Sequence, residues 1–65
     1  MKFFFISSDS NEALSAKKKL ISLYGQNSVE IADVIIPLGG DGFLLKSLHD
    51  FNQFNKPFYG INYGS

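Results

Sequence analysis

The stretch VIIPLGGDGFLLKSLHDF, residues 34–51, decides the fold of this 65-residue chain. An apolar run ends in two glycines, which are followed by Asp41, a third glycine and apolar residues spaced at i, i+4 and i+7. That spacing predicts a helix over residues 43–51. Asp-Gly between apolar runs is also a hairpin signal, but a hairpin needs alternation after the turn, and residues 43–51 show helical spacing instead. We therefore expect a strand, a glycine loop and a helix.

The regions on either side of this stretch predict two more strands and another helix. Residues 3–6 are continuously apolar, as in a strand covered on both faces of a parallel sheet. Asp9 and Glu12 resemble a capping box that starts a helix, and Gly25 is its expected C-cap. In the connector 26–32, the alternation of Val29 and Ile31 predicts a short edge strand. After a polar turn, residues 58–61 form the third expected strand.

The alternation of strands and helices defines the expected fold class. It predicts an α/β fold, a partial doubly wound (Rossmann-like) parallel sheet of about three strands and two helices, joined by right-handed crossovers. Two helices cannot cover both faces of three apolar strands, so we expect the N-terminal part of a larger domain. Pro37 lacks the N–H that a central strand donates, and we expect the ladder to open there.

Composition excludes several classes of function. Six lysines balance six acidic residues and arginine is absent, so no positive field attracts nucleic acid or an anionic membrane. The apolar run near the N-terminus is shorter than a secretory signal needs, no segment is long enough to span a membrane, and cysteine is absent, so we expect a cytoplasmic protein. His49 has no second ligand at metal-site spacing, so we expect no metal ligands in the chain.

The loop Gly39-Gly40-Asp41-Gly42 is the candidate site. A strand that ends in glycines before a helix is a common place for a phosphate, because the backbone approaches closely and the first helical N–H groups point outward. A carboxylate would repel a bare phosphate. Asp41 suits instead a hydroxyl whose proton it accepts, or a divalent cation, and both belong to phosphoryl transfer. The structural alternative is a tight turn with Asp41 as the helix N-cap.

The segments ADVIIPLGGDGFLLKSLH and KPFYGINYGS together resemble the N-terminal domain of NAD kinases. The resemblance implies transfer of the γ-phosphate of ATP to the 2'-hydroxyl of the adenosine ribose of NAD, with a divalent cation such as Mg²⁺. It implies that Asp41 is the catalytic proton acceptor and that Asp41, Gly42 and Leu45 lie against NAD. Loop-shaping roles follow for four residues: Gly39, Gly40, Asn62 and Gly64.

The same resemblance defines what this chain would be within the whole enzyme. Residues 1–65 correspond to the N-terminal portion of the nucleotide-binding α/β domain, without the C-terminal β domain, and we expect them to be inactive alone. NAD and ATP are the expected partners, and the whole enzyme is expected to be a homo-oligomer. Two alternatives remain open, namely a lipid or sugar kinase that shares the Gly-Gly-Asp-Gly loop, and a non-enzymatic nucleotide-binding or interaction module.

Overall fold

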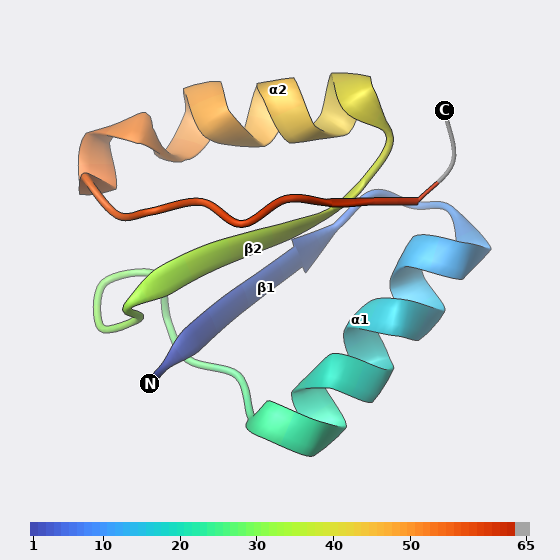
Figure 1. The fold of residues 1–65 in the computed structure, drawn as a ribbon, viewed down its shortest axis with the longest axis horizontal. Helices are drawn as coiled ribbons and strands as arrows, with labels where there is room; N and C mark the ends of the chain where they lie inside the picture. Colours follow the sequence, from blue (N-terminus) through green and yellow to red (C-terminus); the bar gives the residue numbers. More distant parts are fainter. Residues whose placement is uncertain (64–65) are drawn as a thin grey trace.

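A computed structural model, which describes residues 1–63, shows a parallel sheet of three strands in the order β1-β2-β3 with two helices packed on it (Figure 1). The elements in chain order are β1 (Phe3–Ser7), α1 (Asn11–Tyr24), β2 (Val34–Gly39), α2 (Asp41–Phe51), the short 3₁₀ helix η1 (Asn52–Phe54) and β3 (Ile61–Asn62). The predicted fold class, an α/β parallel sheet with alternating strands and helices, is confirmed.

One face of the sheet forms the main core with α1. Phe5 and Ile36 are paired in the β1–β2 register, and both are buried against Ala13 of α1 together with Leu38. Fully burying an apolar side chain of this size contributes about 1.5–3 kcal/mol. The continuous apolar runs in β1 and β2 are explained by this burial, because alternate residues face the opposite side of the sheet.

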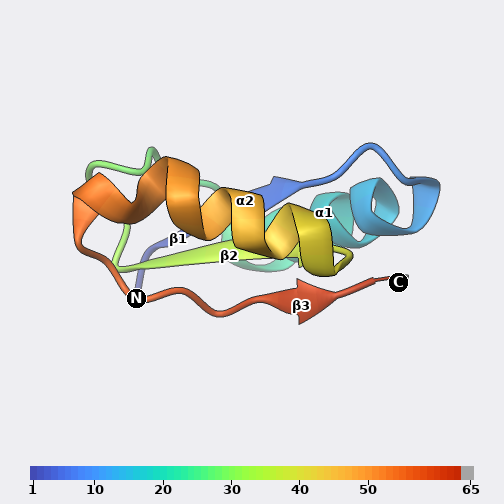
Figure 2. The same cartoon turned by 90° about the horizontal axis from the view of Figure 1, so that it is seen from above.

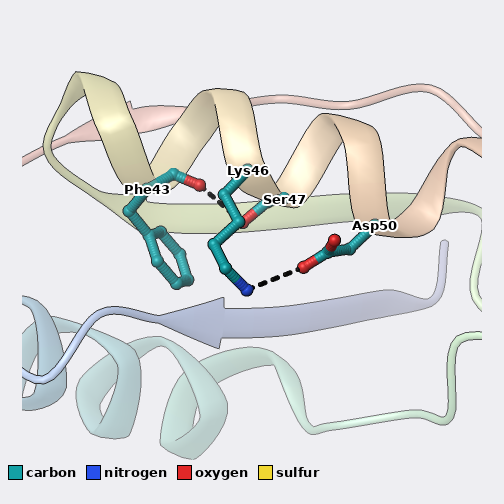
Figure 3. Close-up of polar contacts among 4 residues, drawn as sticks. All are labelled: Phe43, Lys46, Ser47 and Asp50. Carbon is teal, nitrogen blue, oxygen red and sulfur yellow. Dashed lines mark hydrogen bonds and ion pairs between the residues drawn. The ribbon is translucent and has the colours of Figure 1, made fainter.

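The opposite face is covered by α2, so each face of the sheet carries a helix, and the expectation that two helices cannot cover both faces is wrong in that respect. Phe4 of β1 meets Phe51 of α2 edge to face, with ring centroids 5.5 Å apart. Ser47 is buried on this helix and donates its hydroxyl proton to the carbonyl oxygen of Phe43 at 2.9 Å (Figure 3). Figure 3 also shows the ion pair between Lys46 and Asp50, at 3.0 Å. Both of its side chains are largely exposed, so it adds only about 0.3–0.5 kcal/mol.

The two helices therefore lie on opposite faces of the sheet, as the view from above shows (Figure 2). With parallel strands in sequential order, two right-handed crossovers would place both helices on the same face. One of the two crossovers must therefore be left-handed. The expectation that both are right-handed is wrong, although about 98% of such connections follow that rule.

The ends of α1 differ in part from the prediction. The N-cap is Ser10, whose hydroxyl oxygen accepts the backbone N–H of Ala13 at 3.2 Å, and not Asp9. Both residue types are good caps, so the sequence pattern did not decide between neighbouring positions. Gly25 is the C-cap as predicted, with φ of 82°, and its N–H donates to the carbonyl of Ile21 at 2.7 Å.

The connector between α1 and β2 is not the predicted edge strand. The N–H groups of Ile31 and Ala32 both donate to the carbonyl of Ser28, which makes a helical turn. Val29 and Ala32 are buried and Ile31 is 55% exposed. The alternation of Val29 and Ile31 was therefore misleading, because the buried pair is spaced by three residues and belongs to a turn.

The start of the same connector occupies the free edge of β1. The side-chain amide of Gln26 donates to the carbonyl of Phe5 and accepts the N–H of Phe5, both at 2.8 Å. Asn27 donates its backbone N–H and its side-chain amide to the carbonyl of Phe3, at 3.1 and 3.2 Å. These two side chains give β1 the hydrogen bonds that a neighbouring strand would otherwise supply.

The third strand is shorter and begins later than predicted. Phe58 forms only an isolated bridge to Ile35, and regular pairing resumes where Ile61 lies opposite Leu38. Ile35 donates to the carbonyl of Pro57 and accepts from Tyr59, so the next donor of β2 on this side would be residue 37. That residue is proline and has no N–H. Pro37 accounts for this gap, but the β1–β2 ladder runs through Pro37 and the β2–β3 pairing resumes at Leu38, so the ladder is interrupted there and does not open.

Candidate functional site

The glycine loop is a direct passage from β2 into α2. Gly39 is the last residue of β2, Gly40 is the N-cap in an extended conformation, and Asp41 is the first residue of α2. The structural alternative, with Asp41 as N-cap, is wrong. No side chain caps this helix end, so the Asp41 carboxylate is available for other contacts, beside the outward-pointing N–H groups of the first turn.

The glycines of this loop differ in what requires them. A Cβ atom at Gly39 would lie 2.8 Å from Cδ2 of Phe43, so the close approach of the Phe43 ring requires glycine there. A Cβ at Gly42 would meet no atom within 4 Å in the part of the chain that the structure describes. Internal packing of residues 1–63 thus explains Gly39 and leaves Gly42 unexplained. The predicted contact of Gly42 with NAD stays a prediction.

Asp41 makes a direct hydrogen bond to Asn62. The side-chain amide Nδ2 of Asn62 donates to Oδ1 of Asp41 at 2.6 Å, and both side chains are exposed. The contact arises because Asn62 pairs with Gly39 in the β2–β3 register, which brings the end of β3 next to the glycine loop. Sequence reasoning gave Asn62 a loop-shaping role and missed this contact. The signal that could have found it is that adjacent parallel strands end at the same edge of a sheet.

An apolar pocket of about 470 Å³ opens between α2 and the segment that leads into β3. Its lining residues are Pro37, Asp41, Leu44, Leu45, Leu48, Phe58 and Gly60. Asp41 is the only charged residue of this lining. A Cβ atom at Gly60 would lie 3.4 Å from the side chain of Leu44, which is ordinary van der Waals contact, so the segment packs directly against α2.

The structure brings some of the predicted NAD-binding residues together. Asp41 and Leu45 lie one helical turn apart on α2 and both line the pocket, and Leu45 is 69% exposed. Gly42 lies next to Asp41 in the first turn but is not part of the lining. Gly64, predicted to shape the second loop, lies outside the described residues. The functional roles of these residues remain predictions.

Two absences concern the part of the chain that the structure describes. Within residues 1–63, no three histidine, cysteine, aspartate or glutamate side chains come together in a way that could bind a metal ion. Neither α1 nor α2, the helices of the described part of the chain, has the length and apolar character needed to cross a membrane. The described part of the site is therefore a single carboxylate at the rim of an apolar pocket.

Comparison with known proteins gives a consistent result. The chain is 51% identical to the NAD kinase of Brucella suis biovar 1, 48% identical to that of Caulobacter vibrioides and 44% identical to that of Xylella fastidiosa strain 9a5c. Each match extends over 61 residues, 94% of this chain. The chain spans about a quarter of the length of these relatives (24%). Protein-family models give no match. The resemblance to NAD kinases is confirmed over the region that the chain covers.

Proposed function

We propose that this chain forms part of an NAD kinase and supplies the base for phosphorylation of the adenosine ribose of NAD. In the proposed reaction, an oxygen of Asp41 accepts the proton of the 2'-hydroxyl. The hydroxyl oxygen forms a bond to the γ-phosphorus of ATP, and the bond from that phosphorus to the β,γ-bridging oxygen breaks. The products are NADP, ADP and the released proton.

The observation that supports this proposal is the position of Asp41. Its carboxylate is exposed, it begins a helix that no side chain caps, and it stands at the rim of the apolar pocket. A nucleoside needs apolar walls for its base and a polar group beside its ribose hydroxyls. A pocket of about 470 Å³ with one carboxylate meets both needs.

The divalent cation that the resemblance implies has no site of its own in this part of the chain. Among residues 1–63, Asp41 is not part of a group of three or more acidic, histidine or cysteine side chains that could hold a metal ion by themselves. Mg²⁺ is usually bound through one or two carboxylates together with substrate phosphates and waters. We therefore assign no step to a metal held by these residues. ATP, with Mg²⁺ as its expected counterion, remains the proposed phosphoryl donor, and its binding residues are not assigned.

The remaining properties of the whole enzyme are also proposals. We propose that NAD and ATP are its substrates, that it acts in the cytoplasm and that it assembles as a homo-oligomer, as the resemblance implies. The similarity to NAD kinases favours this reaction over phosphorylation of a lipid or a sugar. It also favours an enzyme over a binding module without catalysis.

A hybrid enzyme tests the proposed function. The segment of the Brucella suis NAD kinase that matches this chain is replaced by the chain itself, which is 51% identical to it over 61 residues. We expect the hybrid to form NADP from NAD and ATP. Asp41→Asn should lower kcat at least about 100-fold, because general-base catalysis contributes about 10²–10⁴. Asp50→Asn, which removes an exposed carboxylate of the same helix, is the matched control and should retain activity.

The outcomes of this experiment separate the alternatives. Activity on diacylglycerol or fructose 6-phosphate in place of NAD would reject the substrate assignment. Full activity of the Asp41→Asn hybrid, with wild-type circular dichroism, would reject the role of Asp41 as the base.

A further inference from the structure

We propose that Asn62 is a positioning residue that holds the Asp41 carboxylate in the orientation needed for proton transfer. The inference rests on the proposed function and goes beyond the loop-shaping role that the sequence indicates. Asn62 does not need to touch the substrate. It acts through its hydrogen bond to Oδ1 of Asp41, which leaves Oδ2 without a partner among residues 1–63.

The chemistry of the contact defines its direction. An ionised carboxylate can only accept hydrogen bonds, so the amide nitrogen of Asn62, and not its oxygen, must face Asp41. The distance of 2.6 Å is short, as in hydrogen bonds to a charged partner. The amide keeps its donor at every pH near neutrality and adds no charge of its own. It therefore orients the carboxylate without protonating it.

The backbone around Asn62 is held firmly enough to transmit this orientation. Asn62 lies opposite Gly39 in the parallel ladder, and the next residue, Tyr63, donates its N–H to the carbonyl of Gly39 at 2.9 Å. Asp41 follows Gly39 by two residues at the start of α2. The two ends of the Asp41–Asn62 bond thus belong to backbone segments that are tied together by the sheet.

Asp41 needs such support because little else holds its side chain. It is exposed, and the bond to Asn62 is the one hydrogen bond of its carboxylate within residues 1–63. An exposed aspartate without a partner exchanges among staggered rotamers. Proton transfer requires the accepting oxygen within about 2.6–3.2 Å of the hydroxyl oxygen. Restricting the rotamer raises the fraction of complexes that react.

The test compares two substitutions of Asn62 in the hybrid kinase. Asn62→Ala removes the donor and should lower kcat about 10- to 100-fold, with the KM for NAD changed less than about twofold. Asn62→Asp keeps the size of the side chain but places a second carboxylate next to Asp41, and it should lower kcat further than Asn62→Ala. If Asn62 served only to pack the loop, the isosteric aspartate would be the milder change. That order would overturn the proposal.

A double substitution tests whether Asn62 acts through Asp41. In the Asp41→Asn background, Asn62→Ala should cause no further loss of kcat, because no carboxylate remains to be positioned. Losses that multiply would show that Asn62 acts independently and would overturn the inference. Gln53→Ala, an exposed amide substitution on η1, is the control and should leave kcat and KM unchanged.

A spectroscopic measurement on the hybrid kinase tests the contact without relying on activity. The side-chain amide protons of Asn62 should resonate downfield of those of the exposed Gln53 in a ¹⁵N–¹H spectrum. Asp41→Ala should move the Asn62 signal and leave that of Gln53 in place. An Asn62 signal that ignores Asp41→Ala would overturn the positioning role. An inactive wild-type hybrid that still shows the expected shift would overturn the proposed kinase function alone.

Discussion

At the scale of single residues, the β2–α2 loop contains one glycine that internal packing requires and one that it does not. Gly39 is required by the ring of Phe43, whereas the Cβ position of Gly42 is open space among the described residues. We therefore expect substitution by alanine to have opposite effects on stability at Gly39 and at Gly42.

Gly39→Ala should destabilise the fold by about 1–3 kcal/mol, the usual cost of forcing an extra methyl group into a packed site. The new Cβ would lie 2.8 Å from Cδ2 of Phe43, so the ring and the start of α2 would have to move. Urea unfolding followed by circular dichroism measures the change. A variant as stable as the wild type would mean that Phe43 relaxes at no cost.

Gly42→Ala is the matched counterpart and should stabilise the chain by about 0.4–1 kcal/mol, because alanine reduces the freedom of the unfolded chain and favours the helix. Gly42 lies in the first turn of α2, and its Cβ would meet no neighbour in the described structure. In the hybrid kinase the same substitution should raise the KM for NAD, because the proposed ligand approaches this backbone. An unchanged KM would argue against the predicted contact of Gly42 with NAD.

Much of the site at this scale was predictable from the sequence. The order strand, glycines, carboxylate and helix located Asp41, whereas Leu45, which also lines the pocket, was expected there only from the resemblance to NAD kinases. The hydrogen bond of Asn62 was missed, because the common edge of adjacent parallel strands places Asn62 near Asp41 but only the β2–β3 register fixes the bond itself. Pro37 interrupts the hydrogen bonds of this strand pair without changing its register, because the pairs Ile35–Phe58 and Leu38–Ile61 have the same offset.

At the scale of elements, the helix ends and the sheet edge depend on a few polar side chains. Ser10 starts α1, Gly25 ends it, and Gln26 then turns back onto the outer edge of β1. The sequence correctly predicted the helix and its end at Gly25. It placed the start one residue early, because serine and aspartate are nearly equivalent caps.

Ser10→Ala should lower the free energy of unfolding by about 1 kcal/mol, because it leaves the N–H of Ala13 without its side-chain acceptor. Asp9→Ala, at the neighbouring position, should cost clearly less, since Asp9 is not the cap. Denaturant midpoints of the two variants measured side by side decide between them. The reverse order would restore the capping box that the sequence predicted.

Gln26→Ala should destabilise the chain by about 1–3 kcal/mol, because it leaves both the N–H and the carbonyl of Phe5 without partners. It should also promote self-association, since an open strand edge pairs readily with another chain. Denaturant unfolding and light scattering measure the two effects. Gln53→Ala serves as the control, and a Gln26 variant with the same mass and midpoint would show that water replaces these bonds.

At the scale of the whole molecule, the described chain leaves much apolar surface uncovered. Leu45 and Leu48, which line the pocket, are 69% and 48% exposed, and Tyr59 is 67% exposed. Leu23 and Tyr24, at the end of α1, are 66% and 59% exposed. Apolar surface spread over both sides of a small sheet favours association. The fold class could be predicted because hydrophobic periodicity reports strands and helices, but periodicity does not report which face each helix covers.

The 65-residue chain alone should bind NAD weakly or not at all, and it should show no kinase activity. Catalysis requires a triphosphate held in line with the ribose hydroxyl, and one exposed carboxylate beside an apolar pocket does not hold one. Calorimetry against NAD and an NADP assay measure both properties, and light scattering should show associated species. A soluble monomer that binds NAD with a low-micromolar Kd would contradict this expectation.

The opposite placement of α1 and α2 limits which proteins can exchange parts with this one. In a sheet built with right-handed crossovers throughout, a strand–helix–strand unit in sequential order always delivers its helix to the same side. A unit transplanted from such a domain would place both helices on one face of this sheet and leave the other face without a helix. We therefore expect productive exchange of such a unit only with donors that likewise place one helix on each face of a sheet in this strand order.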